Sequence, residues 1–313
     1  MKRAFVFPGQ GSQTPGMGEA LSAVFPAARQ LFDEVDEALS MHLSRLMFEG
    51  PESELMLTEN AQPALLAVSL AVIRVLERDA GFAIAREAAY VAGHSLGEYS
   101  ALAAAGALSV PEAVRLVQRR GQAMQKAVPV GAGAMAALLG LDVETARAVA
   151  EAAAQGQVCA VANDNCPGQI VVSGHKGAVE RAVALAAGHG ARRSIMLPVS
   201  APFHCSLMSP AADIMAEALA ETALEAPVVP LVANVTAAAT RDPQQIKQLL
   251  VAQATAMVRW RESVLLFAAN QVEEVVEIGA GRVLAGLVRR IDRTLSALSV
   301  GTPAEVEALI KRL

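Results

Sequence analysis

The chain has 313 residues, enough for one large domain or for two unequal ones. Hydrophobic residues make up 53% of it but aromatic residues only 4%, so its core must consist mainly of Ala, Val and Leu. The net charge is −5 and the Lys and Arg residues are scattered, which argues against a nucleic-acid-binding protein.

Targeting signals and membrane segments are not expected. Too few apolar residues precede Pro8-Gly9 for a signal peptide, and the longest apolar stretch, residues 64–73, is interrupted by a serine and too short to span a bilayer. The cysteines are odd in number and lack metal-ligand spacing, so we interpret them as buried thiols in a reducing compartment, which predicts a cytoplasmic protein without a bound metal. They are Cys159, Cys166 and Cys205.

Residues 4–7 predict a short buried strand, followed by the glycine-rich loop 8–13. The loop lacks the Gly-Lys-Ser/Thr and Rossmann patterns of phosphate-binding loops. We expect it at the carboxyl end of a central strand, where open α/β sheets bind ligands. Its glycines would then let a backbone N–H, such as that of Gln10, approach a reacting centre. An ordinary tight turn is the equal alternative.

Residues 19–78 predict helices that act as scaffold. Residues 60–63, which end in a proline, predict a break before a long apolar helix at 64–77.

The most informative motif is Gly93-x-Ser95-x-Gly97, which lies between a predicted buried strand and a predicted helix. This is the spacing of a nucleophile elbow, in which a sharp turn leaves a serine exposed at its apex. The glycines let strand and helix pack without a Cβ clash, and the helix N-terminus stabilises an oxyanion formed beside the serine. We predict that Ser95 is a nucleophile; the alternative is a tight structural turn.

The next helix carries an arginine on its apolar face. Ser109 and Glu112 form a capping-box pattern that predicts where this helix begins. With a period of 3.6 residues, Arg120 falls on the same face as Leu116 and Val117. A guanidinium directed inward is costly unless it meets an anion. The pattern leaves two partners open, a buried carboxylate of this chain or a ligand.

Residues 128–198 predict a smaller domain inserted into the first. Its elements follow the order β-α-β-β-α-β, which is the ferredoxin-like pattern. Strands are expected at 135–139, 158–162, 169–173 and 193–198, helices at 143–154 and 176–187, and a hairpin turn at 163–168. Residues 1–127 and 199–313 form the large domain, predicted as hydrolase-like α/β with a mostly parallel sheet.

His204 lies at a predicted junction between a strand and a helix that begins near Ser206. Catalytic groups concentrate on such loops, and a serine nucleophile needs a base within hydrogen-bond reach. The other large-domain loop histidine, His94, adjoins Ser95 and should point elsewhere. His204 is therefore the candidate base, although the pattern alone leaves this assignment open. The remaining histidines are interpreted as structural or exposed: His42, His175 and His189.

The rest of the large domain is predicted from apolar patterns. Strands are expected at 228–234 and 272–278, helices at 243–260 and up to 291, and a final strand and helix within 296–313.

Three motifs occur in a family-specific order, and a fourth supports them. They are Phe-Pro-Gly-Gln-Gly-Ser-Gln at 7–13, Gly-His-Ser-Leu-Gly-Glu-Tyr at 93–99, Pro-Phe-His at 202–204 and Glu-Ile-Gly-Ala-Gly at 277–281. Together they resemble the malonyl-CoA:acyl carrier protein transacylases of bacterial fatty-acid synthesis, nearly from end to end.

The resemblance implies roles for five residues of this chain. Ser95 is the nucleophile and His204 its base. The backbone N–H groups of Gln10 and Leu96 form the oxyanion hole, and Arg120 binds the free carboxylate of the malonyl group.

Two positions depart from the pattern. The family orients its histidine with a backbone carbonyl, which the resemblance assigns to Arg259, before Trp260, where a glutamine is usual. A carbonyl survives a change of side chain, so we expect the support to persist. Phe203 stands where some fatty-acid enzymes carry serine, and it is compatible with malonyl.

The implied reaction is ping-pong transfer of malonyl from malonyl-CoA to acyl carrier protein, without a cofactor. A monomer that binds neither nucleic acid nor membrane is expected. The transacylase component of a malonate decarboxylase and a trans-acting polyketide acyltransferase share this chemistry. A serine thioesterase or esterase shares Ser95 and His204 but does not need Arg120 on an apolar face. A non-catalytic scaffold that binds carrier protein is the remaining alternative.

Overall fold

Strand β1 (Arg3–Phe7) lies inside a six-stranded sheet in the computed structural model, which describes residues 1–313. Its side chains alternate between two cores: Phe5 and Phe7 belong to one, Ala4 and Val6 to the other. A strand buried on both faces is typical of a sheet covered by helices on both sides.

The first sheet has the strand order β10-β9-β1-β2-β7-β8. Its other strands are β2 (Ala88–Gly93), β7 (Leu231–Val232), β8 (Ala239–Thr240), β9 (Glu274–Ile278) and β10 (Ser296–Val300). All neighbours are parallel except β7 and β8, so the predicted mostly parallel sheet is confirmed. The strand predicted at 228–234 is shorter than expected, since only two of those residues form β7.

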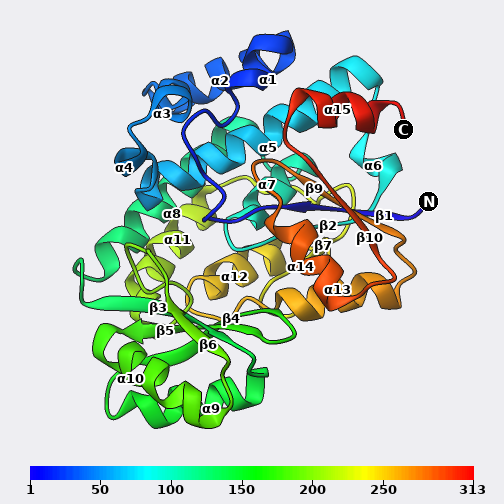
Figure 1. Cartoon of the computed structure of the whole chain (residues 1–313). Helices are drawn as coiled ribbons and strands as arrows, with labels where there is room; N and C mark the ends of the chain where they lie inside the picture. Colours follow the sequence, from blue (N-terminus) through cyan, green and yellow to red (C-terminus); the bar gives the residue numbers. More distant parts are fainter.

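Helices cover both faces of this sheet (Figure 1). On the side of Phe5 and Phe7 lie α1 (Glu19–Val24), α2 (Pro26–Leu39), α3 (Leu43–Glu49), α5 (Thr58–Ala80), α7 (Gly97–Ala104), α8 (Val110–Ala127), α11 (Ser209–Glu221), α12 (Pro243–Gln253) and α15 (Pro303–Ile310). On the other side lie α13 (Trp260–Ala269) and α14 (Val283–Ile291). Two single-turn helices, α4 (Glu52–Leu55) and α6 (Ile84–Glu87), flank α5.

The helix break predicted at 60–63 is wrong, because α5 begins at Thr58 and continues through these residues. Pro63 lies in its second turn and removes one backbone hydrogen bond close to the helix N-terminus, where burial of the surrounding residues outweighs the loss. By length and composition α5 could cross a membrane, but 83% of its apolar window is buried inside the protein. It is the central helix of the larger core.

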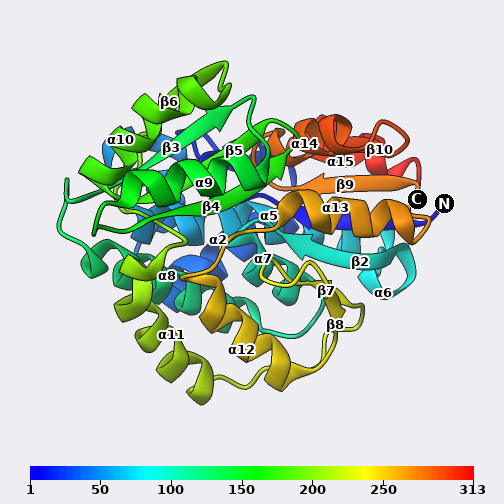
Figure 2. The ribbon, with the colours of Figure 1, turned by 90° about the horizontal axis from the view of Figure 1, so that it is seen from below.

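The second sheet is antiparallel, with the order β4-β5-β3-β6. Its elements are β3 (Gly133–Leu139), α9 (Val143–Ala154), β4 (Cys159–Cys166), β5 (Gln169–His175), α10 (Lys176–Ala186) and β6 (Arg193–Met196). This is the predicted β-α-β-β-α-β order. In Figures 1 and 2 this sheet, with α9 and α10, forms a separate layer beside the first sheet.

The hairpin turn in this sheet is shorter than predicted. Residues 163–166 continue β4, and only Pro167 and Gly168, the latter with φ 73°, form the turn. These residues of β4 are typical of a loop in the sequence, but two of the polar side chains bond to residues outside this sheet rather than to solvent. Asp164 accepts hydrogen bonds from Arg261, and Asn165 bonds to His94.

Candidate active site

Ser95 lies at the sharp turn between β2 and α7, with φ 53°. The two glycines of the motif are required by backbone packing. A Cβ on Gly93 would lie 1.8 Å from the carbonyl carbon of Gly97, and a Cβ on Gly97 would lie 2.2 Å from the carbonyl oxygen of Phe7. Because β1 and β2 are adjacent and parallel, with Phe7 opposite Gly93, the loop after β1 begins next to the turn that carries Ser95.

Asn234, which follows β7 and is fully buried, stabilises this turn with its side-chain amide. Its side-chain N–H donates to the carbonyl of Gly93 at 2.7 Å, and its side-chain oxygen accepts the backbone N–H of Ser95 at 2.7 Å. One amide therefore connects the last residue of β2 with the residue at the bend. A left-handed serine is held in place by such surrounding contacts.

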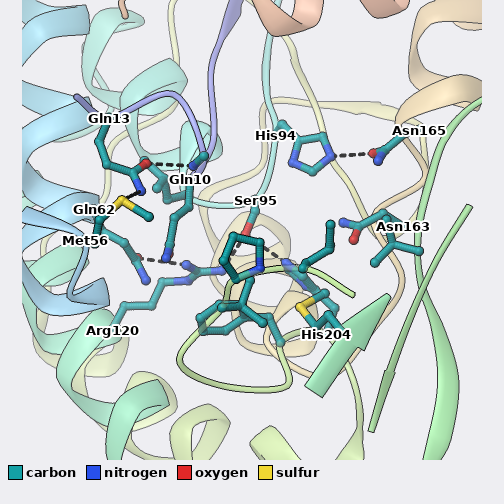
Figure 3. Close-up of a pocket in the computed structure, with 18 residues that line it drawn as sticks. Gln10, Gln13, Met56, Gln62, His94, Ser95, Arg120, Asn163, Asn165 and His204 are labelled. Atoms are coloured by element: carbon teal, nitrogen blue, oxygen red, sulfur yellow. Dashed lines mark hydrogen bonds between the residues drawn. The ribbon is translucent and has the colours of Figure 1, made fainter. Parts of the chain in front are cut away.

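His204 lies next to Ser95, with 2.8 Å between its Nε2 and the serine Oγ (Figure 3). His204 lies in the loop before α11, and its backbone is also left-handed, with φ 59°. Burial, and secondly the positive charge of Arg120, lowers the pKa of His204 to about 3. The imidazole is therefore neutral near pH 7 and able to accept a proton at Nε2.

The carbonyl that orients this imidazole belongs to Gln253, whose oxygen lies 2.9 Å from Nδ1 of His204. A carbonyl only accepts, so Nδ1 carries the hydrogen. Gln253 is the last residue of α12, where helix carbonyls lack an intrahelical partner. The prediction of Arg259 is wrong: its carbonyl accepts the N–H and Oγ–H of Ser263 in the first turn of α13.

Arg120 enters the site from α8 and is only 2% exposed. Nη1 donates to the side-chain oxygen of Gln62 at 2.8 Å. Nη2 donates to the side-chain oxygen of Gln253 at 2.8 Å and to Ser95 Oγ at 3.0 Å. All these partners are neutral, and Arg120 forms no salt bridge. Of the two partners that the sequence left open, a carboxylate of the chain in direct contact is therefore excluded.

A cavity of about 390 Å³ lies in front of Ser95, between the two sheets. Gln10 and Leu96 line it, and neither backbone N–H donates to an acceptor within the chain. The second sheet supplies the facing wall: Met135, Asn163, Asn165 and Val171. As expected, His94 points away from Ser95; its Nε2 lies 2.9 Å from the side-chain oxygen of Asn165 (Figure 3).

Chemically, this arrangement provides a serine, a neutral base and two free N–H groups beside one cavity, which is the equipment of acyl transfer. Residues 4–311 match a family model described as acyl transferase domain. The chain belongs to the acyl transferase domain family.

Relatives within this acyl transferase family span the whole chain. It is 48% identical to the malonyl CoA-acyl carrier protein transacylase of Bacillus subtilis, over 100% of this chain and 97% of that protein. The crystal structure of an acyl-carrier-protein-S-malonyltransferase from Bartonella henselae superposes with a TM-score of 0.97 at 53% identity, covering 100% and 99% of the two chains. A malonyl-transacylase solved in complex with its type II PKS acyl-carrier protein gives a TM-score of 0.96 at 43% identity, with full coverage of both chains.

Sequence reasoning does not identify four residues of this candidate site. Glu98 lies within the motif at 93–99 and Gln62 within the predicted helix break, and the sequence predicts no separate role for either. Gln253 and Asn234 are isolated polar residues in predicted elements. Their signal is that each is polar and buried, a property that emerges only once distant segments are packed together.

Proposed function

We propose that this chain transfers a malonyl group from malonyl-CoA to the phosphopantetheine thiol of an acyl carrier protein, through a malonyl ester of Ser95. One observation carries the proposal. Ser95 Oγ lies 2.8 Å from a neutral imidazole and 3.0 Å from a buried guanidinium that has no carboxylate partner. The malonyl transacylases among the relatives, one of them solved with its carrier protein, support the same activity.

The first half-reaction forms the acyl-enzyme. Ser95 Oγ attacks the thioester carbonyl while its proton passes to Nε2 of His204. The negative charge that develops on the thioester oxygen is stabilised by the backbone N–H groups of Gln10 and Leu96, which line the cavity and have no acceptor of their own. When the tetrahedral intermediate collapses, the carbon–sulfur bond breaks and coenzyme A leaves with the proton from His204.

Arg120 recognises the far end of the acyl group. Three of its five N–H donors are used within the chain, which leaves two, and its bond to Ser95 can be exchanged when the serine reacts. A malonyl carboxylate meets the guanidinium in a charge-assisted pair. An acetyl group has no carboxylate and leaves the buried charge uncompensated, so the pocket selects malonyl.

The second half-reaction repeats these roles. The phosphopantetheine thiol of the carrier protein gives its proton to His204, and its sulfur attacks the malonyl-serine ester. The carbon–oxygen bond breaks, and Ser95 regains the proton. An oxygen ester lies close in energy to a thioester, so both halves can run in either direction. We place this reaction in the cytoplasm, an assignment supported by the three unpaired cysteines.

Intact-protein mass spectrometry tests the proposal directly. Mixing with malonyl-CoA should add one malonyl group, and holo acyl carrier protein should then remove it and gain the same mass. Ser95→Ala should show no adduct. A hydrolase would instead release free malonate at full rate without carrier protein, and that outcome, or a normal adduct on the Ser95→Ala variant, overturns the proposal.

A further inference from the structure

Glu98 takes no part in the steps above, yet it lies three residues after the nucleophile and is only 1% exposed. Both of its carboxyl oxygens accept hydrogen bonds. Oε1 accepts the backbone N–H of Asn234 at 2.7 Å, and Oε2 accepts the side-chain N–H of Gln253. Asn234 holds the bend at Ser95, and Gln253 contacts Arg120.

The amide of Gln253 can adopt only one orientation here. A guanidinium only donates, so the amide atom 2.8 Å from Nη2 of Arg120 must be the oxygen. The amide nitrogen then faces two acceptors, Oε2 of Glu98 and the carbonyl oxygen of Ser95 at 3.0 Å. Turning the amide over would put N–H against N–H at Arg120 and oxygen against oxygen at Glu98.

Both side chains of this bridge are buried, with Glu98 1% and Gln253 0% exposed. Desolvation by burial raises the pKa of Glu98 to about 8, in spite of the hydrogen bonds from Asn234 and Gln253 and the nearby charge of Arg120. Unpaired donors are costly in such surroundings. An ionised glutamate presents two accepting oxygens, and a protonated one keeps a full acceptor beside its O–H group, whereas a glutamine presents one oxygen and one amide group that only donates.

We propose that Glu98 is a positioning residue for malonyl selection: it fixes the amide of Gln253, which in turn presents the Arg120 guanidinium to the acyl carboxylate. The inference rests on the proposed function. His204 is affected much less, because its support is the backbone carbonyl of Gln253, which does not depend on how the amide is turned. Glu98 thus acts on the choice of acyl group more than on the chemical step.

Glu98→Gln is the test variant, because it keeps the shape of the side chain and replaces one acceptor by a donor. The rate of Ser95 acylation is to be measured with malonyl-CoA and with acetyl-CoA. The lost and mispaired hydrogen bond predicts a fall of about tenfold or more in kcat/KM for malonyl-CoA, mostly through a higher KM, and a fall of about threefold or less for acetyl-CoA.

Glu277→Gln is the matched control. Glu277 is also fully buried and accepts two backbone N–H groups, those of Leu284 at 3.0 Å and Ala285 at 2.8 Å, but it lies outside the cavity. We expect this variant to lose thermal stability and to keep the native malonyl-to-acetyl ratio. The same ratio in the native protein and in Glu98→Gln would mean that Glu98 is merely structural and would overturn the inference.

A second variant keeps the inference testable if Glu98→Gln does not fold. Gln253→Leu removes the bridging amide and leaves the carbonyl that orients His204, so it should show the same malonyl-selective loss; an unchanged malonyl-to-acetyl ratio overturns the inference.

Where both single variants fold, the double variant should lose no more malonyl selectivity than the single variants do. Additive losses would count against the bridge. A native protein that forms no malonyl-serine contradicts the proposed function itself, whereas normal native acylation with an unchanged ratio in the variants contradicts only the inference.

Discussion

Arg120 keeps its charge in a buried place where its hydrogen-bond partners supply dipoles and no negative charge. Removing this side chain should therefore harm the substrate that brings a carboxylate more than the one that does not. We expect Arg120→Ala to lower kcat/KM for malonyl-CoA by about a hundredfold or more, the range for a buried charge pair, and to change acetyl-CoA turnover far less. Acylation rates with both thioesters check this. Equal losses would mean that Arg120 serves only the fold.

His204 gives a prediction about pH. Its pKa is lowered from 6.5 to about 3, by burial first and by the Arg120 charge second, so the folded protein keeps the imidazole neutral where a free histidine is protonated. Acylation of Ser95 should therefore show no acid limb near the usual histidine pKa between about pH 5.5 and 7. A rate that falls with an apparent pKa near 6.5 would contradict the assignment.

The same shift has a consequence for stability. Between the folded pKa of about 3 and the usual 6.5, the unfolded chain binds more protons than the folded one. The contribution of His204 to the free energy of unfolding therefore falls as the pH falls through this window. His204→Gln removes that contribution, so its free energy of unfolding should depend less on pH there; an identical dependence in both proteins would count against it.

At the scale of single elements, helix α8 presents Arg120 and begins with the predicted capping box. The hydroxyl of Ser109 accepts the N–H of Glu112 at 3.3 Å, and the carboxylate of Glu112 accepts the backbone N–H of Ser109 at 3.1 Å. Loss of an N-cap typically costs about 1 kcal/mol, and we expect that loss for Ser109→Ala in chemical denaturation. The exposed Ser53→Ala, whose side chain makes no hydrogen bond, is the control and should change stability by less than about 0.5 kcal/mol.

The sequence predicts elements well where local patterns decide them. The bounds of α9 and the capped start of α8 follow from periodicity and caps alone. Prediction fails where distant contacts decide. Pro63 does not break α5 because the surrounding helix is buried, and β4 continues through polar residues that bond to Arg261 and His94, far away in the sequence.

The same distinction holds for the site. The motifs contain Ser95 and His204, helical periodicity singles out Arg120, and the structure brings all three together. The orienting carbonyl is different, because a backbone oxygen has no residue type and hence no signal in the sequence. Only the end of α12 shows that it belongs to Gln253 rather than to Arg259.

At the scale of the whole molecule, an ion pair links the second sheet to α13, which packs on the first sheet; its carboxylate is buried and its arginine side chain is 29% exposed. Asp164 on β4 is 1% exposed and accepts from Nε and Nη2 of Arg261 on α13, each at 2.8 Å. Arg261→Met should leave this carboxylate buried without a partner and lower the free energy of unfolding by about 1–3 kcal/mol. Denaturant titration measures the change.

The matched control lies two residues away. Arg259 pairs with Glu262 within one turn of α13, and both side chains are more than 30% exposed, at 39% and 33%. Arg259→Met should therefore cost less than about 1 kcal/mol, as is usual for surface ion pairs. Equal losses for the two variants would show that the contact between the sheets does not depend on Asp164.

The oxygen that orients the imidazole of His204, the proposed base, belongs to the main chain at the end of α12. In an enzyme that uses an aspartate for this purpose, one base change in the gene can abolish the support. Here every one of the twenty amino acids carries the same oxygen, so the anchor survives any exchange at that codon that leaves the helix in place. Only a mutation that changes the path of the backbone near that helix end, such as a proline, an insertion or a deletion, can move this oxygen.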